Sequence, residues 1–193
     1  MLLGLVILAR AAALPAQAPS TPEILAASVL PLPTALRDGA GVRLVSPAGV
    51  SILRPSSNGL MCTADRPGDA VFDVRCYQVE FLAVMDYVRA GRQQGMPDST
   101  LDARLREAER QGVIRFPASP TAGYRMLGPI AGFDSAAVTT TTAIDRWQSV
   151  HFPFRTAAEL GLPTEREGTM PFVMSSGTWW SHVMIVHNAA ALP

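Results

Sequence analysis

The stretch VSILRPSSNGLMCTADRPGDAVFDVRC, residues 50–76, contains both cysteines of a 193-residue chain and its clearest strand pattern. Near its end, Phe72, Val74 and Cys76 alternate with charged residues. Successive side chains of a strand point to opposite faces, so these three apolar residues share one face. The pattern predicts a strand over residues 70–77 with that face in the core.

Three shorter runs with the same alternation predict strands over residues 42–46, 50–54 and 60–64. The connections between them are rich in turn residues, and Asn58-Gly59 suits the positive φ of a tight turn. We therefore expect an antiparallel meander that continues into residues 70–77. The residues expected on its core face are Val42, Leu44, Val50, Ile52, Leu60 and Cys62.

Both cysteines, Cys62 and Cys76, fall on the expected core face, which favours a disulfide between them. In an exported chain, two cysteines are most simply one structural bridge. A metal or redox role is the less favoured alternative, because a Cys-x13-Cys spacing is not a Cys-x-x-Cys motif. In a reducing compartment the same residues would be buried thiols.

Two amphipathic helices are predicted after the meander, over residues 78–92 and 99–112, and their short joint favours an αα-hairpin. Their apolar stripes are Phe81, Leu82, Met85 and Val88 in the first helix, and Leu101, Leu105 and Ala108 in the second. Ser99 and Asp102 match a weak capping box. A shorter helix is expected over residues 21–29, where Ser20 and Glu23 match a capping box.

The remaining strand signals are weaker. Residues 113–116, 124–127 and 147–154 are candidate strands, whereas Gly128-Pro129 and the threonine run 139–142 are typical of loops.

The end of the chain predicts a hairpin, formed by residues 170–174, a turn at 175–178 and residues 179–187. We expect a single α+β domain over residues 19–193. Its antiparallel sheet combines the N-terminal meander with the C-terminal hairpin, and the αα-hairpin covers one face.

Residues 1–18 match a secretory signal peptide. An apolar run is followed by Ala16-Gln17-Ala18, a small-x-small pattern that predicts cleavage after Ala18. Arg10 follows the apolar run instead of preceding it, so a start site downstream of the true one, or a buried N-terminal helix, is the alternative. The run is too short to span a bilayer, and we expect a periplasmic or secreted protein with no transmembrane segment in the mature chain.

The charge balance argues against nucleic-acid binding. Sixteen basic residues, all of them arginine, match sixteen acidic ones, for a formal net charge of zero. Nucleic-acid binders need a basic face for phosphate contacts. The possible partners are a small ligand or an envelope protein, and the sequence does not identify one.

The stretch GTWWSHVMIVHN, residues 177–188, contains the candidate binding residues Trp179, Trp180 and His182. On a strand, the adjacent tryptophans would point to opposite faces, and the one at the rim would be free to contact a ligand or partner. Burial of both in the core is the alternative. On this basis, we predict that these three residues form a binding site.

The histidines do not predict a metal site. His182 and His187 would lie on opposite faces of a strand, so they cannot bind one ion without a bulge. His151 can approach one of them across a sheet, which gives two ligands at most and no carboxylate. We expect neither a metal nor a cofactor.

Candidate nucleophiles are also weak. Ser175, Ser176 and Ser181 lie near His182 in sequence, but Met174 stands where a G-x-S-x-G motif needs its first glycine. The phosphate-binding G-x-x-x-x-G-K-[ST] pattern needs a lysine that the chain does not contain. No catalytic residue is therefore expected. The alternative is a secreted hydrolase or metal-dependent enzyme that uses His182 with Ser176 or His151.

One group of proteins shares this order of features. The chain resembles a group of uncharacterised exported bacterial proteins from G+C-rich genomes. The features that carry the resemblance are, in order, a leader, a short meander, Ser57-Asn58-Gly59 with Cys62 three residues later, a second cysteine and an αα-hairpin. The resemblance covers about residues 20–116, with a fainter part at 171–186. It implies an exported compartment and this fold, and no catalytic residue. We expect a non-catalytic protein that binds a small ligand or a partner, or that is structural in the envelope.

Overall fold

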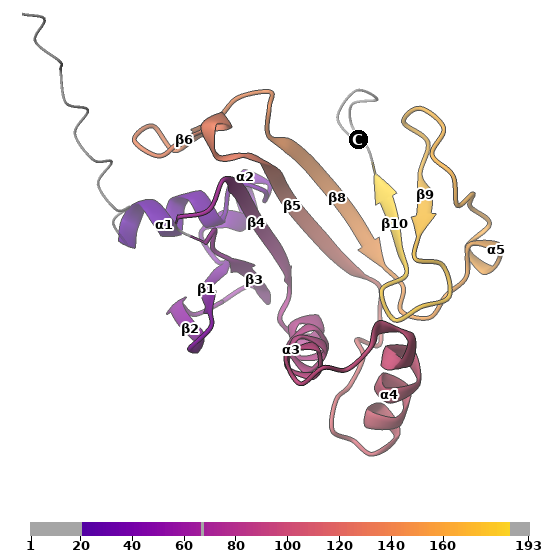
Figure 1. Ribbon diagram of the computed structural model, residues 1–193. Helices are drawn as coiled ribbons and strands as arrows, with labels where there is room; N and C mark the ends of the chain where they lie inside the picture. Colours follow the sequence, from indigo (N-terminus) through magenta and orange to yellow (C-terminus); the bar gives the residue numbers. More distant parts are fainter. Residues whose placement is uncertain (1–20, 67, 186–193) are drawn as a thin grey trace, which may run out of the picture.

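In the computed structural model, which describes residues 21–66 and 68–185, eight strands form one sheet in the order β2-β1-β3-β4-β5-β8-β10-β9 (Figure 1). All neighbouring strands are antiparallel except β1 and β3, which are parallel. The expected α+β class is confirmed. The sheet strands are β1 (Gly41–Ser46), β2 (Gly49–Arg54), β3 (Leu60–Thr63), β4 (Val71–Gln78), β5 (Thr121–Pro129), β8 (Asp145–His151), β9 (Phe172–Met174) and β10 (His182–Ile185).

The helices lie close to their predicted positions. The predicted ones are α1 (Thr21–Ser28), α3 (Val79–Gln93) and α4 (Asp98–Arg110). Two single helical turns, α2 (Thr34–Arg37) and α5 (Ala157–Leu160), are added to them. A 3-10 turn, η1 (Ile130–Gly132), leads into the small hairpin of β6 (Phe133–Asp134) and β7 (Thr139–Thr140). Asp102 does not cap α4. Its carboxylate accepts a hydrogen bond from a distant backbone N–H, described below.

The expected meander is wrong in its strand order. β3 pairs with the far side of β1 instead of with β2, so β2 is an edge strand. The two-residue turn before Gly49 places Leu44 opposite Ser51 and Arg43 opposite Ile52. Residues directly opposite on paired strands share a face, so the apolar residues of β2 point away from the core face of β1. Ile52 is consequently 57% exposed, and Val50 is also exposed.

The prediction for β4 is correct. Phe72, Val74 and Cys76 are completely buried on one face. Cys62 on β3 lies directly opposite Cys76, and the two form the expected disulfide. Tyr77, which points to the other face, is buried as well, because helices cover the sheet there.

The two faces of the sheet have different covers. The αα-hairpin packs on the face of Tyr77, through Phe81 and Val88 of α3 and Leu105 of α4. On the opposite face, the end of α1 packs against Phe72 and the other core residues of β4. The sequence predicted the first cover and not the second. Within α3, Val84 is buried, and Met85, which was expected in the core, is only partly so.

The later strands differ from expectation in four places. Thr139–Thr140, part of the threonine run that was expected to be a loop, form β7. β5 is nine residues long and includes Gly128-Pro129, which had the pattern of a loop. Residues 113–116 do not form a strand. Trp179 and Trp180 lie in the connection before β10 and not on the strand, although the β9–β10 hairpin itself is present.

Some predictions lie outside the described residues. These are the signal peptide with cleavage after Ala18, the Ser20 part of the first capping box, and the position of His187. Within residues 21–66 and 68–185, no helix combines the length and the hydropathy that crossing a membrane requires.

Candidate functional site

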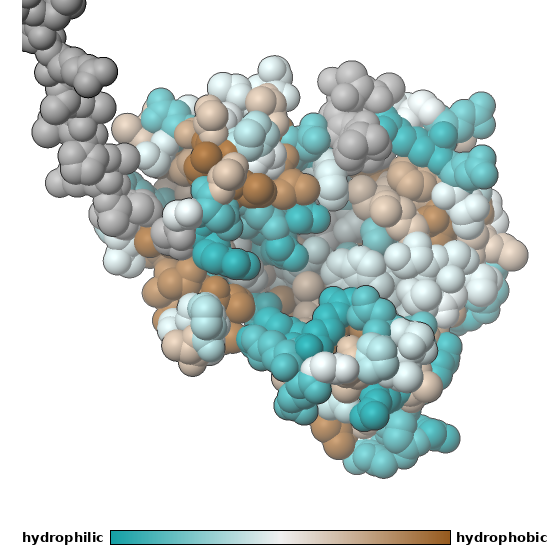
Figure 2. Space-filling model, in the orientation of Figure 1, coloured by the Kyte–Doolittle hydropathy of each residue, from teal (hydrophilic) through white to brown (hydrophobic). Residues whose placement is uncertain are grey.

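A groove of about 1070 Å³ runs between the helix-covered face of the sheet and α3. Its floor is formed by β1, β3 and β4, and one wall by α3. The connection between β3 and β4 closes one end, and the start of α4 with the connection at residues 175–180 closes the other. Figure 2 shows this face hollowed above α3, with hydrophilic surface on both sides of the hollow.

A row of polar side chains crosses the groove floor. In the register of neighbouring strands, Arg43 lies opposite Thr63, Thr63 opposite Arg75, Arg75 opposite Arg125, and Arg125 opposite Trp147. Directly opposite residues share a face, so the five form one line across β1, β3, β4, β5 and β8. We call this line the arginine row. Its members other than Arg125 and Trp147 line the groove directly.

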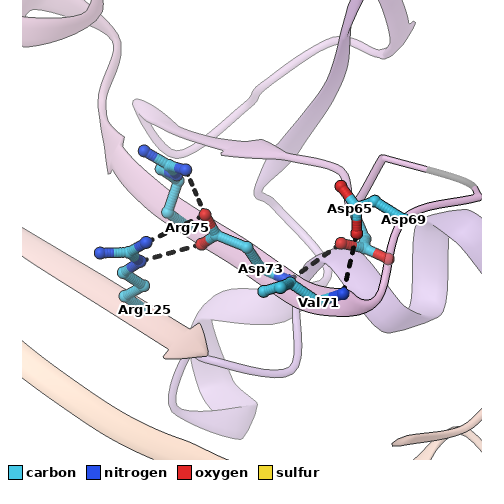
Figure 3. Close-up of polar contacts among 6 residues, drawn as sticks. All are labelled: Asp65, Asp69, Val71, Asp73, Arg75 and Arg125. Carbon is cyan, nitrogen blue, oxygen red and sulfur yellow. Dashed lines mark hydrogen bonds and ion pairs between the residues drawn. The ribbon is translucent and has the colours of Figure 1, made fainter. Parts of the chain in front are cut away.

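Asp73 neutralises part of the row (Figure 3). Arg125 donates to both carboxylate oxygens of Asp73 at 2.9 and 3.0 Å, and Arg75 donates to one of them. The guanidinium of Arg125 also lies 5.3 Å from the ring centre of Trp147. Two arginines therefore share one carboxylate, which leaves one positive charge uncompensated at this point.

Asp86 on α3 repeats this arrangement on the opposite wall. Arg43, only 7% exposed, donates to Asp86 at 2.7 Å and to the hydroxyl of Thr63 at 3.0 Å. Arg89, one turn further along α3, lies 3.6 Å from the same carboxylate. The Nε of Arg89 is buried and has no hydrogen-bond partner among the described residues. Here too, two arginines share one aspartate, one arginine from the sheet and one from the helix.

Acidic residues lie at both ends of the groove. At the β3–β4 end, Asp65 accepts the N–H of Asp73 and Asp69 accepts the N–H of Val71 (Figure 3). Burial raises the pKa of Asp65 above its usual range, and the carboxylates of Asp69 and Asp73 raise it further, whereas hydrogen bonds from the backbone oppose the rise. At the other end, Asp98 pairs with the exposed Arg92.

The two tryptophans line the apolar end of the groove. Asp102 of α4 accepts the backbone N–H of Trp179 at 2.7 Å and so fixes this connection to the helix. Trp180 lies parallel to Phe81 of α3, with ring centres 5.6 Å apart. The sequence named both tryptophans as binding candidates, but their position comes from a turn and not from strand alternation.

The third candidate, His182, does not line the groove. It pairs directly with His151 across β10 and β8, and the ring centres are 4.9 Å apart. Its Nδ1 donates to the carbonyl of Trp180 at 2.6 Å, which leaves Nε2 as the unprotonated nitrogen of the neutral ring. Burial lowers the pKa of His182, although the hydrogen bond to Trp180 opposes this. The sequence predicted that His151 can approach a second histidine across a sheet, and the pairing does so.

His151 is almost completely buried among Tyr77, Phe81, Trp180 and His182. Its Nε2 lies 3.1 Å from the hydroxyl of Ser149, and its Nδ1 has no partner in the described part of the chain. Burial, together with the neighbouring His182, lowers the pKa of His151 to about 3. A base this weak takes up little of a serine proton at neutral pH. Ser149 and His151 therefore lie at the distance of a nucleophile and its base, but His151 is too weakly basic for that role.

Two of the three serines considered from the sequence are used structurally, and the third, Ser175, lines the groove. Ser176 accepts the backbone N–H of Ala157 at 2.8 Å, and Ser181 donates to the carbonyl of Arg155 at 2.6 Å. Within residues 21–66 and 68–185, no three His, Cys, Asp or Glu side chains are grouped so that they could hold a metal ion. Of the partners considered for His182, His151 lies beside it, whereas the hydroxyl of Ser176 is bonded to Ala157.

Sequence reasoning missed the arginine row. Arg43, Arg75 and Arg125 each belong to a different strand, and only the strand order and register place them in one line, with Thr63 between Arg43 and Arg75. One signal was available, since Asp73 and Arg75 occupy the non-core positions of a strand whose other side is buried. That signal marked a polar face and gave no indication of its partners.

Comparison with protein-family models, with curated proteins and with solved structures found no match for this chain.

Proposed function

We propose that this protein is a non-catalytic binding protein for a small molecule, which occupies the groove between the sheet and α3. The observation that carries the proposal is the arginine row on the floor of a groove of about 1070 Å³. Small-molecule sites are typically concave, with apolar walls and a few fixed polar groups. Here the tryptophans and α3 supply apolar surface, and the row supplies fixed donors.

Catalysis is less well supported than binding. The enzyme alternative uses His182 with Ser176 or His151. Ser176 is engaged by Ala157, and His151 is a weak base. The contact between His151 and Ser149 favours this alternative most, but a catalytic base needs a pKa closer to the working pH. We therefore retain the groove and not the histidines as the site.

Export remains part of the proposal. The Cys62–Cys76 disulfide is stable in an oxidising compartment, such as the periplasm or the extracellular space. The predicted signal peptide and the resemblance to exported bacterial proteins agree with this location. The remaining alternative is a role in the envelope, in which a protein partner would bind the face that carries the groove.

A thermal-shift screen of small metabolites tests the binding proposal. A compound that binds only the native state at about 100 times its Kd should raise Tm by roughly 5 to 10 °C. Thr63→Trp and Val45→Trp, which place a large side chain in the groove, should remove this shift. Val113→Trp adds the same side chain at a position that is 61% exposed and outside the groove, so it should leave the shift unchanged.

Two results would contradict the proposal. One is a screen in which no compound raises Tm. The other is a shift that persists in both groove variants, because the compound would then bind elsewhere. Both variants must first melt at the wild-type temperature without ligand, which shows that they fold.

A further inference from the structure

We infer that the ligand of this groove carries one carboxylate or phosphate group, and that Arg75 of β4 and Arg89 of α3 hold this group between the sheet and the helix. The inference rests on the proposed function and names the chemical class of its ligand. Three observations lead to it: the sharing of two aspartates by four arginines, an unpartnered donor, and the residues at the two ends of the groove.

Two aspartates beside the groove are each shared by two arginines. On the sheet, Arg75 and Arg125 share Asp73. Between the sheet and the helix, Arg43 of β1 and Arg89 of α3 share Asp86. One carboxylate neutralises only one of two guanidinium groups, so one positive charge remains uncompensated. An anion between the walls would be attracted by both excess charges, and more strongly in a recess than in open water.

Arg89 is also the residue with hydrogen-bonding capacity left. Its Nε is buried without a partner among the described residues, and its closest approach to Asp86 is 3.6 Å, longer than a hydrogen bond. A buried donor without an acceptor costs about 1 to 3 kcal/mol. An oxygen of a carboxylate or phosphate would satisfy it with a charge-assisted bond, the type that arginine forms best.

The two ends restrict the rest of the ligand. At the β3–β4 end, Asp65 and Asp69 outnumber Arg66, so this end would repel a second anionic group and tolerate a neutral or cationic one. Trp179, Trp180 and Leu101 at the other end offer apolar and aromatic surface. The two aspartates at that end are engaged, Asp98 by Arg92 and Asp102 by the backbone N–H of Trp179. The groove therefore fits a molecule with a single anionic group attached to an apolar or aromatic body.

Matched probes test the charge requirement. Phenylacetate and phenyl phosphate are anionic, 2-phenylethanol is the neutral match, and phenethylamine is the cationic match. Each is titrated into the full-length, disulfide-bonded protein by calorimetry and by tryptophan fluorescence, up to about 10 mM, which reaches weak binding. We expect at least one anionic probe to bind about tenfold or more tightly than the neutral and cationic probes.

Arg75→Gln and Arg89→Gln locate the anion. Each variant leaves its aspartate with one remaining arginine, so the ion pairs Asp73–Arg125 and Asp86–Arg43 persist. We expect each variant to weaken binding of the anionic probe by about tenfold and to leave the neutral probe unchanged. Arg110→Gln removes an exposed arginine of α4 outside the groove, and it should leave all affinities unchanged.

The outcomes separate the two proposals. If the neutral or cationic probe binds as tightly as the anionic ones, and Thr63→Trp removes this binding, the groove binds ligands but the anion assignment is overturned. If an anionic probe binds and neither Arg75→Gln nor Arg89→Gln weakens it, the assigned residues are wrong. If no probe of any charge binds, this inference fails, and the metabolite screen alone decides whether the proposed function fails with it.

Discussion

Arg75 and Arg125 lie directly opposite each other on β4 and β5, and both guanidinium groups donate to the carboxylate of Asp73. Like charges directly opposite on a sheet are destabilising, so this pair depends on the aspartate beside it. The arrangement is the centre of the arginine row, and it explains how two arginines can lie directly opposite each other on neighbouring strands.

Replacing Asp73 should therefore destabilise the protein. Asp73→Ala leaves two arginines without their shared acceptor, and we expect a loss of about 1 to 2 kcal/mol in urea unfolding, because all three side chains are partly exposed. Adding Arg125→Leu to the Asp73→Ala variant removes the repulsion between the two arginines and should restore part of the lost stability. The difference between Asp73→Ala and wild type should shrink at 1 M salt, where the Debye length is about 3 Å. A loss that is independent of salt would contradict the electrostatic explanation.

Reduction of the disulfide should lower stability without removing the fold. The Cys62–Cys76 bridge has a sequence separation of 14, and the chain-entropy model gives about 3 kcal/mol for a loop of this size. Urea unfolding of oxidised and reduced protein measures the difference. The double variant Cys62→Ala, Cys76→Ala should not respond to reductant. Two free thiols in the native protein would show that the bridge is absent.

His151 should make stability fall in mild acid. Its folded-state pKa of about 3 lies below the ordinary value of 6.5, so the unfolded state binds the proton and the folded state does not. The contribution is complete above pH 6.5 and is lost as the pH falls toward 3. From pH 7 to pH 5 the loss from this residue is about 2 kcal/mol. His151→Gln should flatten that slope in urea unfolding, and an equal slope in both proteins would contradict the cause.

Asp102 should fix the tryptophan connection to α4. Asp102→Ala removes the acceptor for the N–H of Trp179, and we expect a loss of about 1.5 to 3 kcal/mol with a red shift of tryptophan emission. Asp102→Asn keeps an acceptor oxygen and should lose less than half as much. Equal effects of both substitutions would assign the role to charge and not to the hydrogen bond.

Gly123 should not accept a side chain. A Cβ at this position on β5 would lie 2.6 Å from the hydroxyl of Ser149, 2.8 Å from Tyr77 and 2.9 Å from His151. Overpacking of this kind costs about 1 to 3 kcal/mol, and we expect Gly123→Ala to lower Tm accordingly. Ser149→Ala in the same chain removes the nearest atom and should recover part of the loss. A wild-type Tm for Gly123→Ala would contradict the predicted clash.

Most features that depend on residues within one element were predicted correctly, and most features that depend on contacts between elements were not. Alternation in β4 and the stripe of α4 were correct, since each depends on residues within one element. The prediction that Val50 and Ile52 lie on the core face was wrong. The turn before Gly49 sets the register of β2, and β2 is an edge strand with no neighbour on its other side. The second cover, α1, was missed since nothing in its own pattern identifies the face it packs on.

The sequence by itself determined the α+β class, the positions of the helices and the pairing of Cys62 with Cys76. These follow from hydrophobic period, turn residues and parity, which are local properties of the chain. The tertiary structure decided the candidate site. Parallel pairing of β1 with β3 places Arg43 in line with Arg75 and Arg125, and packing of α3 over that line creates the groove. Strand order depends on which long-range pairings bury the most surface together, and no local pattern encodes it.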